Sequence, residues 1–152
     1  MSSDSIDCRL ITPEAELVNA KIRYAQLPAW DGQMGIMPNH APFVGKLGLG
    51  ELRLDFSGGG AGAASKGEGG SRRFLVEDGF VQINNNQMRI LATLAIPAER
   101  LTESEAQTEL QQVSNRTVPA DAPDRAKQSE RLTKERRRAE LKLRMARANR
   151  GI

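Results

Sequence analysis

The hydrophobic period of this chain changes once, close to Pro97, and this change constrains the fold more than any other feature. Before Pro97 apolar and polar side chains alternate, most clearly in residues 51–56, where Leu52 and Leu54 have charged neighbours. After Pro97 apolar residues recur every three or four positions. A period of two is typical of strands with one wet face, and a period near 3.6 is typical of helices. The sequence therefore predicts a β domain over residues 1–97 and a helical region over residues 98–152.

Turn signals divide the strand-rich region at short intervals, for example at residues 30–33, 37–42 and 84–86. Because no helical segment lies between the strands, an antiparallel sandwich or barrel is favoured over a parallel α/β sheet. Residues 57–71 contain no apolar side chain larger than alanine, so they have little to bury against the cost of ordering. We expect a flexible glycine-rich loop there.

Two helices are expected after the period changes. The first should cover about residues 102–115, because Thr102 and Glu105 have the spacing of a capping box. Two prolines in residues 117–123 should end it, and a second helix, rich in good helix formers, should cover about residues 124–149. Helices joined by a short turn pack as an antiparallel hairpin. Its apolar stripe is thin, so the hairpin should be only marginally stable by itself.

Composition argues against several classes of protein. No window approaches the roughly 18 apolar residues of a membrane-spanning helix, and residues 1–7 lack the basic start of a secretion signal. With one cysteine, Cys8, and one histidine, His40, neither a disulfide scaffold nor a Cys/His metal site is expected. No nucleophile or carboxylate pair has a recognisable catalytic context. We therefore expect a protein that is not an enzyme.

The charge of the chain is divided unevenly. Residues 1–123 carry 11 Lys and Arg against 15 Asp and Glu, whereas residues 124–152 carry 11 against 4, a net charge of +7. A segment so basic should have an anionic partner, and the residues alone allow nucleic acid, an anionic lipid surface or an acidic protein face. One interpretation is therefore a β-sandwich adaptor with a basic, nucleic-acid-binding helical tail.

A second interpretation comes from residues 31–43, which read DGQMGIMPNHAPF. They closely resemble the G-x-x-G-I-x-P-x-H-A-P signature of the ε subunit of F-type ATP synthases, the counterpart of mitochondrial δ. Matching segments at residues 10–14, 48–53, 79–81 and 88–92 follow in the family's order, so the resemblance covers nearly the whole chain. It implies an antiparallel β-sandwich of about ten short strands followed by a C-terminal helical hairpin.

The resemblance also implies a role. A member of this family is a non-catalytic rotor subunit of the proton-transporting complex, which links γ to the c ring and regulates ATP hydrolysis through its C-terminal helices. Its partners would be γ, the c-subunit ring and the α and β subunits, with no nucleic acid. It would be a peripheral protein on the cytoplasmic face of the bacterial inner membrane, with membrane contact only through the c ring.

Two sets of contact residues follow from the resemblance. The signature loop would face the c ring and γ through Gln33, Met34, Ile36, Met37 and His40. The alternative for its apolar residues, stronger for Ile36 than for Met37, is that they pack into the sandwich. The second helix would meet an acidic region of β through basic residues, with a regulatory effect. These residues are Arg131, Lys134, Arg136, Arg137, Arg138, Lys142 and Arg144.

No cofactor is expected. Some bacterial relatives bind ATP through an I/L-D-x-x-R-A motif at the start of the first helix, and the corresponding residues here are 101–106, L-T-E-S-E-A. Thr102 stands in place of the motif's aspartate, and Glu105 in place of its arginine. An anion where a cation is needed repels a triphosphate, so the sequence argues against ATP binding by this route.

Overall fold

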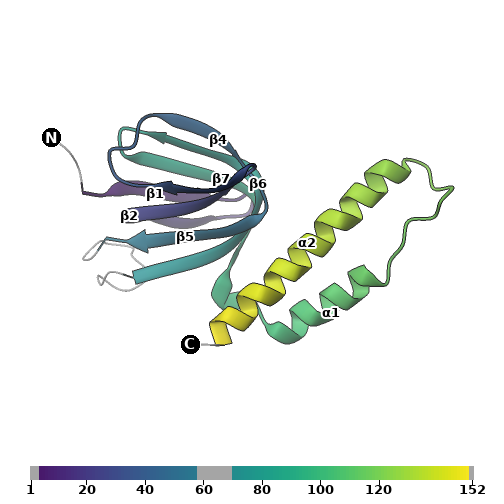
Figure 1. The fold of residues 1–152 in the computed structure, drawn as a ribbon. Coiled ribbons are helices and arrows are strands. Elements are labelled where there is room, and N and C mark those ends of the chain that lie inside the picture. The colour runs from purple at the N-terminus through teal and green to yellow at the C-terminus, as the bar shows by residue number, and fades with distance from the viewer. Residues whose placement is uncertain (1–3, 58–69, 151–152) are drawn as a thin grey trace. The chain divides into compact units, whose positions relative to one another are not determined.

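The computed structural model describes residues 4–57 and 70–150, with side chains as far as Ala148. The chain divides into two compact units, residues 1–97 and 98–152. Figure 1 shows the strands of the first unit and the helices of the second. The described strands are β1 (Ile6–Ile11), β2 (Glu16–Ala29), β3 (Gly32–Ile36), β4 (Phe43–Leu47), β5 (Gly50–Phe56), β6 (Gly70–Asn84) and β7 (Gln87–Pro97).

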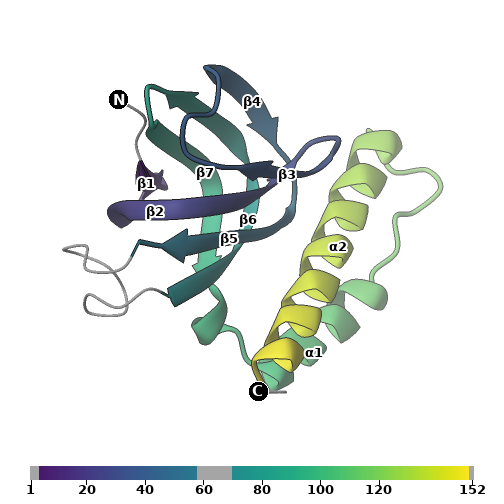
Figure 2. The same ribbon diagram turned by 60° about the vertical axis from the view of Figure 1, so that its left-hand side comes forward.

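Three long strands take part in both layers of the sandwich (Figure 2). β2 pairs with β1 through residues 16–22 and with β3 and β5 through residues 22–29. β6 pairs with β5 over residues 70–76 and with β4 over residues 79–83. β7 pairs with β6 along its length and with β1 over residues 87–91. The prediction of about ten short strands was therefore wrong. The described residues form seven, because each long strand passes from one pairing to the next without a break.

One strand pair departs from the expected antiparallel arrangement. β1 runs parallel to β7, with Asp7 opposite Gln87 and Ile11 opposite Leu91. The other seven described pairs are antiparallel. The parallel pair joins the first and last strands of the sandwich, so local alternation carries no signal for its direction. The predicted β-sandwich followed by two C-terminal helices is otherwise confirmed.

The core follows the predicted two-residue alternation. Leu52, Leu54 and Phe56 are buried on β5, as are Ile6, Cys8 and Leu10 on β1. Burial raises the pKa of the Cys8 thiol to about 12, so this cysteine stays protonated and packs as a small apolar side chain.

Asp55 breaks the alternation, because the sequence places it on the wet side of β5 and the structure buries it. Arg53 donates two hydrogen bonds to its carboxylate, Nε to Oδ1 at 3.0 Å and Nη2 to Oδ2 at 2.9 Å. The hydroxyl of Ser71, on β6, donates a third at 2.6 Å. The hydrogen bonds from Arg53 are the largest cause that lowers the pKa of Asp55, and Ser71 adds to it. The buried charge is thus satisfied across two strands.

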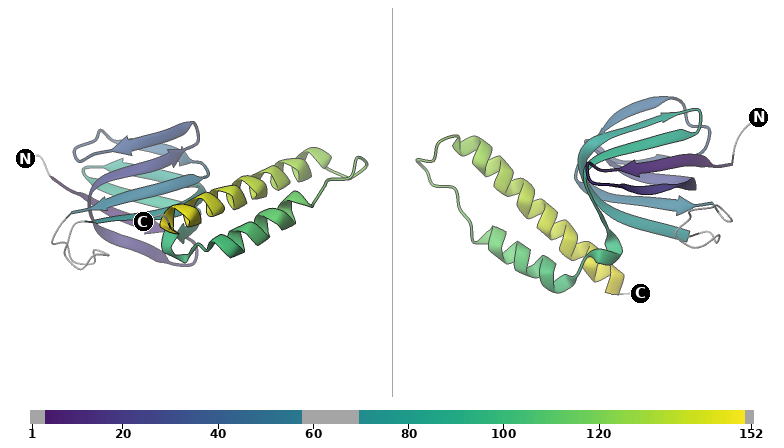
Figure 3. Two further views of the ribbon diagram at one scale, coloured as in Figure 1. Left: turned by 60° about the horizontal axis from the view of Figure 1, so that its bottom comes forward. Right: turned by 180° about the vertical axis from the view of Figure 1, so that it is seen from behind.

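The second unit is a helical hairpin preceded by the short 3-10 helix η1 (Ala98–Arg100). α1 (Glu103–Ser114) and α2 (Arg125–Arg150) run antiparallel (Figure 3). Their ion pairs follow that direction: Glu103 with Arg147, Glu109 with Lys142, and Arg116 with Glu135. No helix in the described residues is long and apolar enough to cross a membrane.

The predicted helix boundaries are within one residue of those observed, but the capping box is not formed. Thr102 is the N-cap of α1 with extended backbone angles, and its carbonyl accepts from the amide of Ala106 at 3.1 Å. Its side chain makes no capping hydrogen bond. The spacing of Thr102 and Glu105 therefore identified the start of the helix without the side-chain contacts that usually accompany it.

Most of the predicted glycine-rich loop, residues 57–71, lies outside the described residues, which resume at Gly70. Its last two residues belong to β6, because Gly70 pairs with Phe56 and Ser71 with Asp55. The strand therefore begins slightly earlier than the composition indicated.

Candidate docking site

The signature segment of residues 31–43 forms β3, a connecting loop of residues 37–42, and the start of β4. Met37 is 64% exposed at the start of the loop, and Gln33 is exposed on β3. Met34 and His40 are half-buried. Ile36 is fully buried in the core. In this conformation Ile36 anchors the segment from inside, which is the alternative to a surface position that the sequence left open for it.

His40 is held within its own loop. A ring nitrogen, Nδ1, lies 2.7 Å from the carbonyl oxygen of Ala41, and the imidazole meets the ring of Phe43 edge to face at a centroid distance of 6.2 Å. These contacts make His40 part of the internal packing of the loop. The described residues contain no cluster of three His, Cys, Asp or Glu side chains suited to a metal ion.

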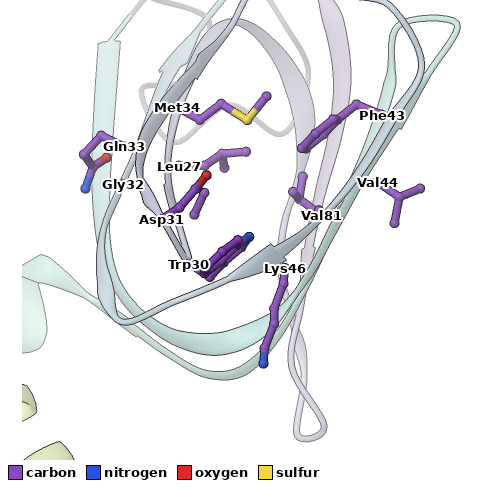
Figure 4. Close-up of a pocket in the computed structure, with 12 residues that line it drawn as sticks. Leu27, Trp30, Asp31, Gly32, Gln33, Met34, Phe43, Val44, Lys46 and Val81 are labelled. Carbon is purple, nitrogen blue, oxygen red and sulfur yellow. The ribbon is translucent and has the colours of Figure 1, made fainter.

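A pocket of about 540 Å³ opens between the β2–β3 hairpin and β4 (Figure 4). Met34 and Phe43 line opposite walls, and Trp30 lies near one end. Trp30, the only tryptophan, is 71% exposed. Asp31 and Lys46 also line the pocket, so an apolar surface carries one charge of each sign. Exposed apolar side chains around a concavity are typical of contact sites.

A glycine explains the position of one pocket wall. The ring of Phe43 folds over Gly45 on the same side of β4, where a Cβ would lie only 2.6 Å from ring carbons. Any larger residue at position 45 would push Phe43 out of its place beside His40. Gly45 therefore fixes an aromatic side chain that both the loop and the pocket use.

A second apolar surface crosses the outer side of four strands, and we call it the sheet-face row. The register places Lys46 opposite Phe80, Phe80 opposite Leu91, and Leu91 opposite Ile11. Phe80 is 57% and Leu91 49% exposed, and Ile11 is half-buried. The sequence analysis missed this row because Phe80 and Leu91 each stand beside a buried apolar residue, which hides the alternation. The pairing register alone brings its members together.

The basic residues predicted to contact β do not share one face of α2. Arg131, Lys134, Arg136, Arg137 and Arg144 are exposed and Arg138 is half-buried. At 100° per residue these positions spread around the helix. Lys142 is engaged inside the hairpin, where its ammonium lies 3.0 Å from a carboxylate oxygen of Glu109. It is therefore not available to a partner in this conformation.

The start of α1 offers acidic groups where the ATP motif of some relatives has a cation. Thr102 and Glu105 are both exposed. Glu105 lines a shallow hollow of about 280 Å³ together with Glu109. Its other lining residues among those described are uncharged: Ser104, Thr108 and Gln112. Two carboxylates disfavour a triphosphate at this hollow.

Comparisons with known proteins agree on one family. The sequence family described as the β-sandwich domain of the ATP synthase delta/epsilon chain matches residues 5–98. The ATP synthase epsilon chain of Rhodopirellula baltica is 30% identical over 122 residues, which cover 80% of this chain and 85% of that one. The chloroplastic epsilon chain of Chlamydomonas reinhardtii is 33% identical, over 67% of this chain and 69% of the other.

Solved structures show the same fold. A chain of the Euglena gracilis mitochondrial ATP synthase, in a structure of OSCP, F1 and the c ring, matches 94% of this chain and 78% of its own length, with a TM-score of 0.65 and 17% identity. A chain from the central stalk and c ring of the Tetrahymena thermophila enzyme matches 96% of this chain and 99% of its own length, with a TM-score of 0.59 and 13% identity.

The class that emerges is a β-sandwich carrying a C-terminal helical hairpin, with exposed apolar surfaces suited to assembly. The chain belongs to the ATP synthase delta/epsilon family and functions as a component of that complex. The resemblance carried by residues 31–43 is thereby confirmed.

Proposed function

We propose that this chain is a non-catalytic subunit of the central stalk, which joins γ to the c ring through its sandwich and regulates ATP hydrolysis through its helices. The observation that carries the proposal is the signature loop of the family, with Met37 exposed and a pocket containing Trp30 beside it. As part of a membrane-associated complex, the chain would lie peripherally on the cytoplasmic face of the bacterial inner membrane.

An interface that connects γ to the c ring needs more surface area than one short loop provides. A stable interface buries about 800 Å² on each partner, which is 20 to 30 residues. The loop of residues 37–42 is too short to supply this area alone. The pocket and the sheet-face row extend the exposed apolar surface of the sandwich beyond the loop. We assign the loop and pocket to the c ring and γ, and the sheet-face row to γ.

Regulation would use the exposed arginines and lysines of α2. Each exposed ion pair with an acidic surface of β is worth about 0.2 to 1 kcal/mol, so several pairs together would shift an equilibrium that one pair would not. Because the cations surround the helix, α2 would meet β with more than one orientation available. No cofactor is part of this proposal, since Glu105 and Glu109 disfavour a triphosphate at α1.

The adaptor with a nucleic-acid-binding tail rests on the charge of α2 alone, whereas the family assignment rests on the sandwich and most of the chain. The two interpretations differ in what copurifies with the protein. Under the proposal, γ and the c ring copurify from detergent extracts, and nuclease treatment changes nothing.

The sandwich interface is tested by Met37→Glu. This change puts a charge on an exposed apolar side chain and leaves the core untouched, so the chain should fold normally and lose γ and the c ring in a pull-down. Thr117→Glu, which adds the same charge to the exposed connection between α1 and α2, is the control and should retain them. Full retention of both partners by Met37→Glu would argue against the proposed interface.

A further inference from the structure

The conformation of the signature loop, residues 37–42, depends on a contact with the β6–β7 hairpin, which is distant in the sequence. The side-chain oxygen Oδ1 of Asn86 accepts a hydrogen bond from the backbone amide of Asn39 at 2.6 Å. In return, the side-chain nitrogen Nδ2 of Asn86 donates to Oδ1 of Asn39 at 3.0 Å. The two residues are 47 positions apart in the sequence, so this reciprocal pair ties the loop to another part of the sandwich.

Asn86 is itself held firmly. It is the second residue of the two-residue turn between β6 and β7, whose flanking residues Asn84 and Gln87 pair. Both turn residues have positive φ, 50° for Asn85 and 60° for Asn86, which is the backbone that short hairpins favour. The carbonyl oxygen of Asn86 also accepts from the amide of Asp7 on β1 at 2.8 Å. Asn86 is therefore held by β6, β7 and β1, independently of its contact with the loop.

The loop needs such an anchor. Pro38 and Pro42 have no amide hydrogen, which removes two of the donors that would otherwise stabilise it. Asn39 stands between them with φ of 68°, in the left-handed region. That conformation is uncommon for residues other than glycine, although asparagine tolerates it better than most. A turn of this kind has several accessible alternatives, and two hydrogen bonds from a rigid hairpin select one of them.

We infer that Asn86 is a positioning residue for the partner-binding loop: its side-chain amide holds residues 37–42 in the conformation that presents Met37. The inference rests on the proposed function for the identity of the partner, but not for the contact itself. Asn86 touches the loop and need not touch the partner. Its effect on binding is to reduce the conformational cost that the loop pays on docking.

Asn86→Gly tests this role because it removes the side chain while keeping positive φ easy to adopt. Asn85→Gly is a matched control in the same turn, with the same substitution and nearly the same φ. Loss of two neutral hydrogen bonds should speed amide exchange at Asn39 by roughly tenfold in Asn86→Gly. The exchange of core amides, and all exchange in the control, should stay as in the wild type.

The binding measurement uses the full chain labelled with 5-fluorotryptophan, because Trp30 is the only tryptophan and supplies a single fluorine resonance in the pocket of the proposed interface. Titration with a purified γ–c-ring subcomplex should show Asn86→Gly binding about tenfold more weakly than wild type and control. Asn86→Asp keeps an acceptor for the Asn39 amide and loses only the donated bond, so it should restore part of the affinity.

The outcomes separate the inference from the proposed function. Unchanged exchange at residues 37–42 in Asn86→Gly, or unchanged affinity despite faster exchange, overturns the inference and leaves the proposed function standing. Equal weakening in Asn85→Gly also overturns it, because the effect would then belong to the turn. Failure of the wild-type chain to bind the subcomplex overturns the proposed function, and with it the role of Asn86 in docking.

Discussion

The sandwich and the helical hairpin are stabilised by different kinds of interaction. The sandwich has a continuous core of fully buried apolar side chains from all seven described strands. The hairpin buries fewer and mostly smaller apolar side chains, Ala106 and Val113 on α1 and Ala139, Leu141, Leu143, Met145 and Ala146 on α2. Three ion pairs join its two arms, two from α1 and one from Arg116 just after α1. Hydrophobic burial is not weakened by the screening of charges, whereas exposed ion pairs weaken as ionic strength rises. The comparison indicates a rigid docking unit joined to a regulatory unit that solution conditions can loosen.

The largest effect should come from a cavity in the sandwich. Leu54→Ala removes a fully buried side chain from β5 and should lower the free energy of unfolding by about 2 to 5 kcal/mol. Leu132→Ala, at a half-buried position on α2, should cost clearly less. Urea denaturation of the full chain, followed by circular dichroism at strand and helix wavelengths, measures both. Equal losses of unfolding free energy at the two positions would mean that apolar burial stabilises the sandwich and the hairpin to the same degree.

The buried carboxylate of β5 should come next. Asp55→Asn replaces charged hydrogen bonds to Arg53 and Ser71 with weaker neutral ones, at a cost of about 1 to 3 kcal/mol near pH 7. Because folding lowers the pKa of Asp55, its contribution is complete above the unfolded-state value of about 3.9 and is lost as pH falls through the lower folded-state value. Urea midpoints of wild type and variant should therefore converge below pH 4. A constant gap across that range would mean that the charge of Asp55 contributes nothing.

A smaller effect is expected from reversing the charge of three adjacent arginines on α2. Changing Arg136, Arg137 and Arg138 to Glu should raise ATP hydrolysis by the purified complex several-fold at low salt, because the summed attraction to β is removed. Docking of the sandwich should be unaffected, and the difference in hydrolysis should shrink as ionic strength rises. Identical hydrolysis rates for variant and wild type at low salt would leave these arginines without the proposed regulatory role.

The smallest predicted effect concerns the ion pair between Lys142 and Glu109. A double-mutant cycle with Lys142→Met and Glu109→Gln should give a coupling energy of about 0.2 to 1 kcal/mol, because both side chains are partly exposed. The coupling should fall in 0.5 M salt. A coupling energy that did not change with salt would mean that packing of the Lys142 stem, rather than charge, joins the helices there.

The sequence predicted individual strands and helix ends, because these depend on the pattern of neighbouring residues. The alternation of residues 51–56 predicted β5, and the proline pair of residues 117–123 predicted the end of α1. Pairings between distant segments were out of reach. The parallel contact of β1 with β7, the hydrogen bond to the buried Asp55 from a serine on another strand, and the sheet-face row all require a register that no local pattern encodes.

The candidate site divides in the same way. The motif in residues 31–43 identified the family, but it left open which of its apolar residues pack into the sandwich; the structure buries Ile36 and exposes Met37. The sequence around an apolar residue near a loop is the same whether its side chain points into the core or to the surface. Trp30 was recognised only as part of a turn, because the pocket beside it forms where β4 approaches the β2–β3 hairpin.

The passage of β2, β6 and β7 through both layers has a mechanical consequence. In a sandwich whose layers are joined only by loops, shear is resisted by the side chains packed between the two layers. Those side chains can slide past one another. Here the two layers share three continuous backbones, so a shear applied to one sheet is transmitted to the other through covalent bonds and ladder hydrogen bonds. Such a domain, placed between two rotating partners, would rotate as one piece, and the angle between its two faces would change little.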